Sequence, residues 1–441
     1  MKRNCKVLVN VLLMCLLLVV TTSSQAFADA ASDARIDRLE AALKQLQTEL
    51  AELKAERQTE KQVSEKQIET VVTKVLDSKV PAAQDAIAQV PAWLNKLSFS
   101  GDFRYRHETA DSYANNDWQK GRSRHRFRAR FNLGVEVNEE FDVKFRFVSG
   151  TVSPVSSNQT MQDSFSTKDF LLDRAYLDWH PESIDGLNVY AGKMKMPFYT
   201  PLESLLIWDN NISPEGGAIK YAIDLQDNTK IYLTGGGFWV DEDSGGVDTS
   251  LWGGQSYIKK QLEAERYVIG GVSYYDYGNI KNRGSLESTW STGNSFYGNT
   301  IVGAGGNQVY ANDYNIFELF GEYGFQAYDM PIAVGGQWVR NFAADSGKDT
   351  AWFTGITINR AKKKGTWQAR YNYRETQADA VLGAFSDDSF ANGVTNSKGS
   401  AFGFDYMLAE NVMGSLTYYL NERGENDDDL RKIQADVKIK F

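Results

Sequence analysis

Hydrophobic and polar residues alternate strictly over much of the chain. In "RSRHRFRARFNLGVEV" (residues 122–137), an arginine stands at every second position from Arg122 to Arg130, and apolar residues such as Phe127 and Phe131 stand between and after them. Successive side chains leave a strand on opposite faces, so a period of two predicts a β-strand with one cationic and one apolar face. Either a soluble sandwich or a membrane barrel with a wet channel would satisfy this pattern.

The alternation recurs from Leu97 to Phe441, in stretches such as "FDVKFRF" and "IQADVKIKF". It predicts about sixteen strands, although several middle segments alternate poorly and fourteen or eighteen remain compatible with the pattern. The predicted strands cover residues 97–108, 122–137, 141–149, 170–180, 187–196, 217–225, 230–240, 251–262, 267–278, 314–325, 331–342, 351–361, 367–376, 399–409, 412–422 and 430–441.

The connections between these strands alternate in length. Short connections ("NEE", "PESIDG", "QDNT", "KKKG") alternate along the chain with long polar connections at 109–121, 151–168, 281–313 and 378–398. Short turns on one rim and long loops on the other are typical of outer-membrane barrels. No domain boundary interrupts residues 97–441, whereas a soluble all-β chain of this length usually divides into domains. We therefore predict an all-β transmembrane barrel of about sixteen antiparallel strands.

Aromatic residues near the predicted strand ends support a membrane setting, because Trp and Tyr collect at membrane–water interfaces. These residues are Tyr105, Trp179, Tyr190, Trp239, Trp352, Trp367 and Tyr418.

The N-terminus has the pattern of a secretory signal peptide. Lys2, Arg3 and Lys6 precede an apolar run, and Ala28 ends a small-x-small cleavage motif, so residues 1–28 are expected to be removed. Both cysteines of the chain lie in this segment, which excludes thiol chemistry from the mature protein. Loss of the three basic residues changes the net charge from −9 to −12, which argues against nucleic-acid binding.

Residues 29–80 have the pattern of a coiled-coil stalk. Apolar residues alternate spacings of three and four from Ile36 to Leu53, in a segment without Gly or Pro, which is a heptad seam. Residues 81–96, which contain Pro81 and Pro91, form a linker, and the barrel follows at 97–441. No segment after residue 28 is apolar for long enough to form a membrane-spanning helix.

The chain from about residue 97 onward resembles the putative-porin family of Gram-negative outer-membrane proteins. The resemblance is carried by "DRAYLDWHP" (173–181), "LNVYAGKMKMPFY" (187–199), "WDNNISPEGG" (208–217) and a last strand that ends in Phe441. It extends to the phosphate-selective porins, and it implies a homotrimer of sixteen-stranded barrels with arginine-lined pores, in contact with outer-membrane lipid and lipopolysaccharide. The acidic net charge departs from the phosphate-selective pattern.

Nine arginines are candidates for the pore lining, because their parity places them opposite the apolar face. They are Arg104, Arg106, Arg124, Arg126, Arg128, Arg130, Arg146, Arg370 and Arg374. Same-face residues along a strand are about 6.8 Å apart, less than the Debye length in physiological salt, so neighbouring charges reinforce one another and attract anions. The alternative is structural pairing with carboxylates such as Asp102 and Glu108, and both roles can coexist.

The segment 197–216 is unusually apolar for an exposed loop. We expect it to fold into the barrel and narrow the pore, with Glu203, Asp209 and Glu215 at the constriction; extracellular packing between subunits is the alternative. We interpret the acidic clusters at 241–248 and 424–429 as solvated loop tips or as weak cation sites.

Enzyme chemistry has little support in the sequence. The three histidines have no metal-ligand spacing, no phosphate-binding loop is present, and only a serine–histidine pair using His107 or His125 on a barrel wall could act as a phospholipase. We expect no cofactor and no metal. The predicted function is passive diffusion of small hydrophilic solutes, biased towards anions, across a Gram-negative outer membrane, with the stalk in the periplasm. The alternative is a structural tether that uses the stalk.

Overall fold

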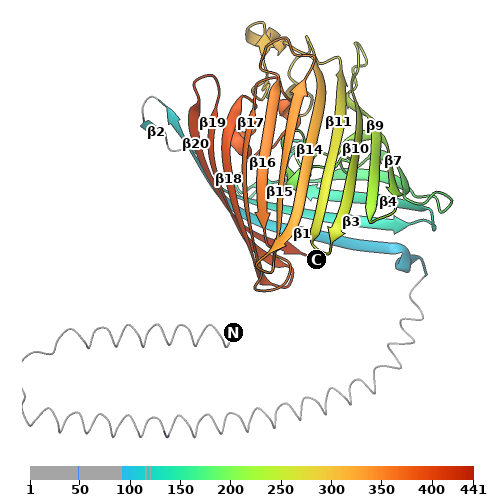
Figure 1. The fold of residues 1–441 in the computed structure, drawn as a ribbon. Coiled ribbons are helices and arrows are strands. Elements are labelled where there is room, and N and C mark those ends of the chain that lie inside the picture. The colour runs from blue at the N-terminus through green and yellow to red at the C-terminus, as the bar shows by residue number, and fades with distance from the viewer. Residues whose placement is uncertain (1–47, 49–91, 115–116, 120) are drawn as a thin grey trace, which may run out of the picture. The chain divides into compact units, whose positions relative to one another are not determined.

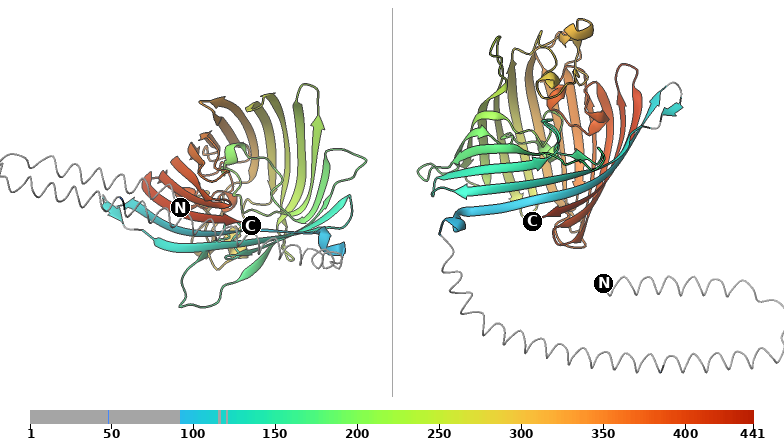
Figure 2. Two further views of the ribbon diagram at one scale, coloured as in Figure 1. Left: turned by 90° about the horizontal axis from the view of Figure 1, so that it is seen from below. Right: turned by 180° about the vertical axis from the view of Figure 1, so that it is seen from behind.

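The computed structural model describes Thr48 and residues 92–114, 117–119 and 121–441. The predicted signal peptide, the coiled-coil stalk except for Thr48, and all but the end of the linker lie outside these residues. In the described part, sixteen long strands follow one another around a closed antiparallel barrel, as Figures 1 and 2 show. The predicted fold class is confirmed for this part of the chain.

The long strands agree with the predicted segments to within a few residues at most ends. They are β1 (Leu97–Ala114), β3 (Ser123–Glu136), β4 (Phe141–Ser149), β6 (Phe170–Trp179), β7 (Leu187–Lys193), β8 (Glu215–Asp224), β9 (Thr229–Asp241), β10 (Thr249–Glu263), β11 (Arg266–Gly278), β14 (Tyr314–Ala327), β15 (Met330–Asn341), β16 (Thr350–Ile358), β17 (Trp367–Thr376), β18 (Ser397–Ala409), β19 (Val412–Arg423) and β20 (Asp428–Lys440).

Short elements lie in the connections. They are β2 (Asp117–Gln119), β5 (Gln159–Thr160), β12 (Ile301–Val302) and β13 (Val309–Tyr310), with single 3-10 turns at η1 (Ala92–Lys96), η2 (Pro201–Glu203), η3 (Leu286–Thr289), η4 (Gly305–Asn307), η5 (Gly383–Phe385) and η6 (Phe390–Asn392). Among the described residues, no helix is long and apolar enough to cross a bilayer.

The barrel closes where the first strand pairs with the last. β1 and β20 are antiparallel in register from Asp102 opposite Lys440 to Ser112 opposite Leu430. On its other edge β1 pairs with β3 from Leu97 opposite Val135 to Thr109 opposite Ser123. Every long strand therefore has a partner on both sides, which leaves no open edge in the sheet.

The two rims differ as the sequence predicts. The connections after β3, β6, β8, β10, β14, β16 and β18 are short and share one rim, while the long connections after β1, β4, β7, β11 and β17 share the other. One short turn consists of Tyr328 and Asp329, with φ of 51° and 59°. Positive φ at both central residues matches the twist of the flanking strands and fixes the hairpin register.

Apolar side chains cover the outer face of the barrel. Phe99, Phe131 and Trp239 are exposed there, whereas Arg106 and Arg126 on the opposite parity are buried in the lumen. Tyr190 is an exception to the predicted aromatic girdle. Its parity opposes that of the outward-facing Val189, so it turns inwards and meets Tyr176, with ring centroids 6.1 Å apart.

Three long loops contribute side chains to one apolar core on the lumen side of the barrel wall. They are the β7–β8 loop (194–214), the β11–β14 loop (279–313) and the β17–β18 loop (377–396). Their buried side chains, including Leu206, Trp208 and Leu382, pack against the inward faces of β9 to β11 and β14 to β16. The prediction of 378–398 as a polar loop is wrong, because the apolar residues from Ala380 to Phe385 lie in this core.

Candidate permeation site

The β1–β3 pairing creates a strip of guanidinium groups along one side of the lumen. Arg104 lies opposite Arg128 and Arg106 opposite Arg126, while the carboxylates Asp102 and Glu108 lie opposite Arg130 and Arg124, respectively. All six predicted arginines of these two strands therefore face inwards.

Three carboxylates share these six cations. Asp102 accepts hydrogen bonds from Arg128 at 2.6 Å and from Arg130 at 2.6 Å. Asp436 of β20 accepts hydrogen bonds from Nε and Nη2 of Arg106, at 2.7 and 2.8 Å, respectively. Glu108 accepts from Arg124. Among the described residues, no other carboxylate lies within 4 Å of these arginines, so the strip keeps an excess of positive charge.

Each of the other three predicted arginines pairs with one carboxylate. Arg146 of β4 donates to Asp173, and Arg374 of β17 donates to Asp387 in the β17–β18 loop. The guanidinium carbon of Arg374 also lies 3.7 Å from the ring centroid of Phe390, a cation–π contact. Arg370 lies 3.0 Å from Asp405 of β18.

The β7–β8 loop crosses the lumen and is attached to the opposite wall by buried polar groups. The Tyr199 hydroxyl donates to Glu322 of β14 at 2.7 Å, and the backbone N–H of Leu202 donates to the same carboxylate at 3.0 Å. The Ser204 hydroxyl donates to Gln337 of β15 at 2.7 Å. Because these acceptors are buried, detaching the loop would leave them unsatisfied.

Two of the three predicted loop carboxylates face the lumen. Glu203 lines a cavity together with Arg104, Arg128 and Arg130. Asp209 is buried deeper, and its carboxylate lies within 4.8 Å of those of Asp387 and Asp388. Burial raises the pKa of Asp209 above its ordinary value, and the two neighbouring carboxylates raise this pKa further.

The prediction that Glu215 faces the arginines is wrong. β8 begins at Glu215, and this residue has the same parity as Ile219, whose side chain is exposed on the outer face. Its side chain is 63% exposed and lies 2.6 Å from the ammonium of Lys193. Glu215 therefore takes no part in the lumen.

Two groups of potential metal ligands come together among the described residues, namely Asp209 with Asp387 and Asp388, and Asp142 with Asp178 and His180. Each group already holds a cationic side chain. Arg374 donates to Asp387, and the Lys144 ammonium donates to Asp178 at 2.6 Å. We therefore assign no metal to either group.

Two cavities lie along the arginine strip. One, of about 850 Å³, is lined by residues that include eight basic side chains but only the carboxylates Glu203, Glu265, Glu322 and Asp405. Its basic residues are Arg104, Arg128, Arg130, Arg360, Lys362, Arg370, Lys438 and Lys440. The other cavity, of about 290 Å³, lies nearer the rim of long loops and includes Glu108, Arg124, Asp388 and Lys432.

The sequence comparison decides the family. The family described as "Putative porin" matches residues 109–305 and 306–440, which is most of the chain. The chain belongs to this family. The resemblance of the sequence to the putative-porin family is confirmed. The further similarity to the phosphate-selective porins is not specifically supported.

Solved structures of the Rhodopseudomonas blastica porin also align with this porin. Two engineered variants of that protein match with 14% sequence identity over 78% of this chain and 100% of theirs, at TM-scores of 0.44 and 0.45. No curated protein matches the sequence significantly.

Sequence reasoning missed several residues of this porin's lumen. Asp387 and Ser389 enter it on the β17–β18 loop, where the Lys432 ammonium donates to the Ser389 carbonyl at 2.6 Å. Asn158 enters it on the β4–β6 loop and accepts a hydrogen bond from Arg104. The apolar run "AVLGAF" within 377–396 is the same signal that identified the β7–β8 loop, and it could have revealed the β17–β18 loop as well.

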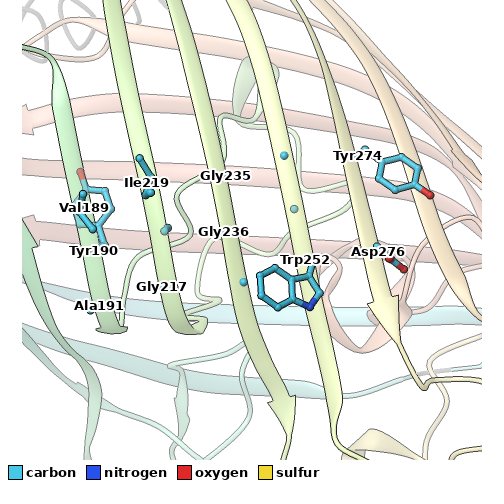
Figure 3. A pocket seen from close by; sticks show the side chains of 14 residues that line it. Val189, Tyr190, Ala191, Gly217, Ile219, Gly235, Gly236, Trp252, Tyr274 and Asp276 are labelled. Atoms are coloured by element: carbon cyan, nitrogen blue, oxygen red, sulfur yellow. The ribbon is translucent and has the colours of Figure 1, made fainter.

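A further groove, of about 770 Å³, lies on the outer wall of the porin (Figure 3). Ile219, Trp252 and Tyr274 border it, and glycines such as Gly235 and Gly254 form its floor. A Cβ atom added at Gly254 would meet no atom within 4 Å, so the hollow results from missing side chains. It faces away from the lumen and is separate from the permeation site.

Proposed function

We propose that this outer-membrane porin conducts small hydrophilic solutes passively and favours anions. The observation that carries the anion preference is the unequal charge of the β1–β3 strip, where six arginines share three carboxylates. The larger cavity adds to this, because its basic residues outnumber its carboxylates two to one. The acidic net charge of the whole chain is no guide to the field inside the pore.

The mechanism is sieving combined with electrostatic selection. The folded-in loops fill one side of the lumen with apolar side chains, so solutes are confined to the side where the arginines lie. Charges in a narrow passage with low-dielectric walls act more strongly than the same charges in bulk water. Anions are therefore concentrated along the strip and cations are depleted there.

Trimeric assembly has support in the lengths of the strands. β7 has seven residues, whereas β10 has fifteen. A strand of seven residues is about 24 Å long and, tilted by about 45°, rises about 17 Å, which is less than the roughly 25 Å apolar band of an outer-membrane barrel. We propose that a neighbouring subunit covers this short wall, with lipid and lipopolysaccharide around the rest. The periplasmic stalk remains a proposal from the sequence.

The reversal potential across a planar bilayer in a KCl gradient tests the proposed anion preference. The wild-type pore should give a chloride-favouring potential. The double variant Arg126→Ala/Arg128→Ala reduces the excess charge of the strip from three to one, and its potential should move clearly towards that of a non-selective pore. A cation-favouring wild-type pore would contradict the proposal. A folded barrel that does not conduct would favour the tether.

A further inference from the structure

The nine predicted arginines fall into two classes by their distance to the nearest carboxylate. Seven have a carboxylate oxygen within 3.1 Å; they are Arg106, Arg124, Arg128, Arg130, Arg146, Arg370 and Arg374. The other two do not. The nearest carboxylate oxygen lies 3.9 Å from Arg104, on Asp436, and 3.7 Å from Arg126, on Glu108.

The same neutral segment of the β4–β6 loop contacts both of these guanidiniums. Arg104 donates through Nη2 to the side-chain oxygen of Asn158. Arg126 donates through Nη2 to the Asn158 carbonyl at 3.5 Å and to the Ser156 hydroxyl at 3.3 Å. In each guanidinium, Nε is buried without a hydrogen-bond partner among the described residues. Both side chains therefore keep positive charge and donor capacity that their neighbours do not use.

These two arginines lie on the part of the strip between the two cavities, because Arg126 stands on β3 between Arg124, which lines the smaller cavity, and Arg128, which lines the larger. Arg104 lines the cavity of about 850 Å³. Arg126 lies next to Glu108, which lines the cavity of about 290 Å³ nearer the rim of long loops. We expect a solute that moves along the strip from one cavity to the other to pass this pair.

We infer that Arg104 and Arg126, braced by Asn158, form a subsite that binds the oxyanion of a passing solute. An anion at Arg106 must displace the two hydrogen bonds of Asp436, but at Arg104 and Arg126 it meets no tightly bound carboxylate. A guanidinium presents parallel N–H groups that match two oxygens of one carboxylate or phosphate group, and a halide cannot use that geometry. The solute class is therefore small molecules that carry a carboxylate or phosphate. This inference rests on the proposed anion preference and adds a binding site to it.

Saturable inhibition of the chloride current by acetate or inorganic phosphate tests the subsite. In single-channel recordings in KCl, either probe should lower the current with a half-saturating concentration. In Arg104→Gln/Arg126→Gln this concentration should rise about tenfold or more, because hydrogen bonds to two charged groups are lost. Comparing the two probes shows whether the site prefers a planar or a tetrahedral oxyanion.

Two further variants separate binding from the general field and from folding. Arg128→Gln removes a charge from the same strip but leaves both guanidiniums of the subsite in place, so it should shift the reversal potential and raise the half-saturating concentration by no more than about two- to fivefold, the effect of one nearby charge. Asn158→Asp keeps every arginine and places a carboxylate against Arg104, in the segment that also contacts Arg126, so it should strongly weaken the inhibition.

The outcomes distinguish the subsite from the proposed function. A chloride-selective wild-type pore whose current is not saturably inhibited would overturn the subsite and leave the anion preference standing. Equal weakening in Arg128→Gln and in Arg104→Gln/Arg126→Gln would also overturn it, because the strip would then act only through its summed charge. A pore that does not prefer chloride would instead overturn the proposed function.

Discussion

The β1–β3 wall and the β14–β15 wall are built by the same alternation, yet their inward faces have opposite characters. β3 presents Arg124, Arg126, Arg128 and Arg130 to the lumen, whereas β14 presents residues such as Tyr314 and Ile316. The difference lies in what covers each wall. Loops pack onto β14 and β15 and make their inward face part of a protein core, while the arginine wall stays next to the cavities.

This comparison shows that strand parity determines which residues point inwards, but not whether they line a pore. Tyr275, Tyr277 and Tyr314 all point inwards and are essentially fully buried. Glu318 and Glu322 also point inwards, but their oxygens are occupied by Gln337 at 2.6 Å and by Tyr199 at 2.7 Å. The proposed anion preference therefore rests mainly on the wall that lies outside the apolar core.

The largest effect is expected from a substitution that loosens the loops packed on β14 and β15. Trp208→Ala removes a side chain that is 3% exposed in the lumen core, at a cost of about 3–5 kcal/mol. The loops should loosen, and single-channel conductance should rise. Trp239→Ala is the matched control, because Trp239 is 63% exposed on the outer face and its loss should leave conductance unchanged. Equal conductance in both variants would show that the core does not confine the pathway.

A smaller effect should follow when the charged wall is made more positive. Asp102→Asn removes the carboxylate that Arg128 and Arg130 share, which raises the excess charge of the strip from three to four. The chloride preference, measured as a reversal potential, should increase by a factor of about two to five, because one charge at these distances in wet surroundings is worth about 1 kcal/mol. Glu215→Gln, on the outer face, should leave the reversal potential unchanged. A fall in chloride preference with Asp102→Asn would mean that the released arginines leave the pathway.

The smallest effect should be a pH dependence of loop docking. The pKa of Asp209 is raised in the folded protein by burial and by Asp388 and Asp387, so the folded state binds the proton more tightly than a detached loop does. Docking is therefore strongest below the ordinary Asp pKa of about 3.9 and weakens as the pH rises from there through the raised pKa. Brief current fluctuations caused by undocking of the loop should become rarer on acidification. The Asp209→Asn pore should show few such fluctuations already at neutral pH. Fluctuations in this variant that still respond to pH in the same way would assign the effect to another group.

Much of the barrel could be predicted from the sequence because lipid and water impose a period of two on every strand. The order of the strands and the division into two rims follow from this period and from the connection lengths. The inward direction of Arg124, Arg126 and Arg128 follows from parity alone. Glu215 shows the limit, because a strand that starts two residues earlier than predicted brings a supposed loop residue into the outer wall.

The pairing of the arginines could not be predicted, because it depends on contacts between residues far apart in the chain. The partner of Arg106 is Asp436, 330 residues away, and the partner of Arg374 is carried by a loop whose path the alternation does not encode. Parity could identify the set of nine arginines, but only the closed structure separates the two loosely paired ones from the rest.

The contact between Arg106 and Asp436 joins the first and last strands of the ring, and this has a consequence for biogenesis. The seam between β1 and β20 cannot form until β20 has been synthesised, because β20 is the strand that completes the ring. For a flexible segment of 330 residues, bringing the two ends together costs about 5 kcal/mol of entropy, and the pairing of the intervening strands lowers this cost before the seam closes. Assembly is therefore post-translational, and until the seam closes β1 and β20 each expose an unpaired edge that must be protected from aggregation.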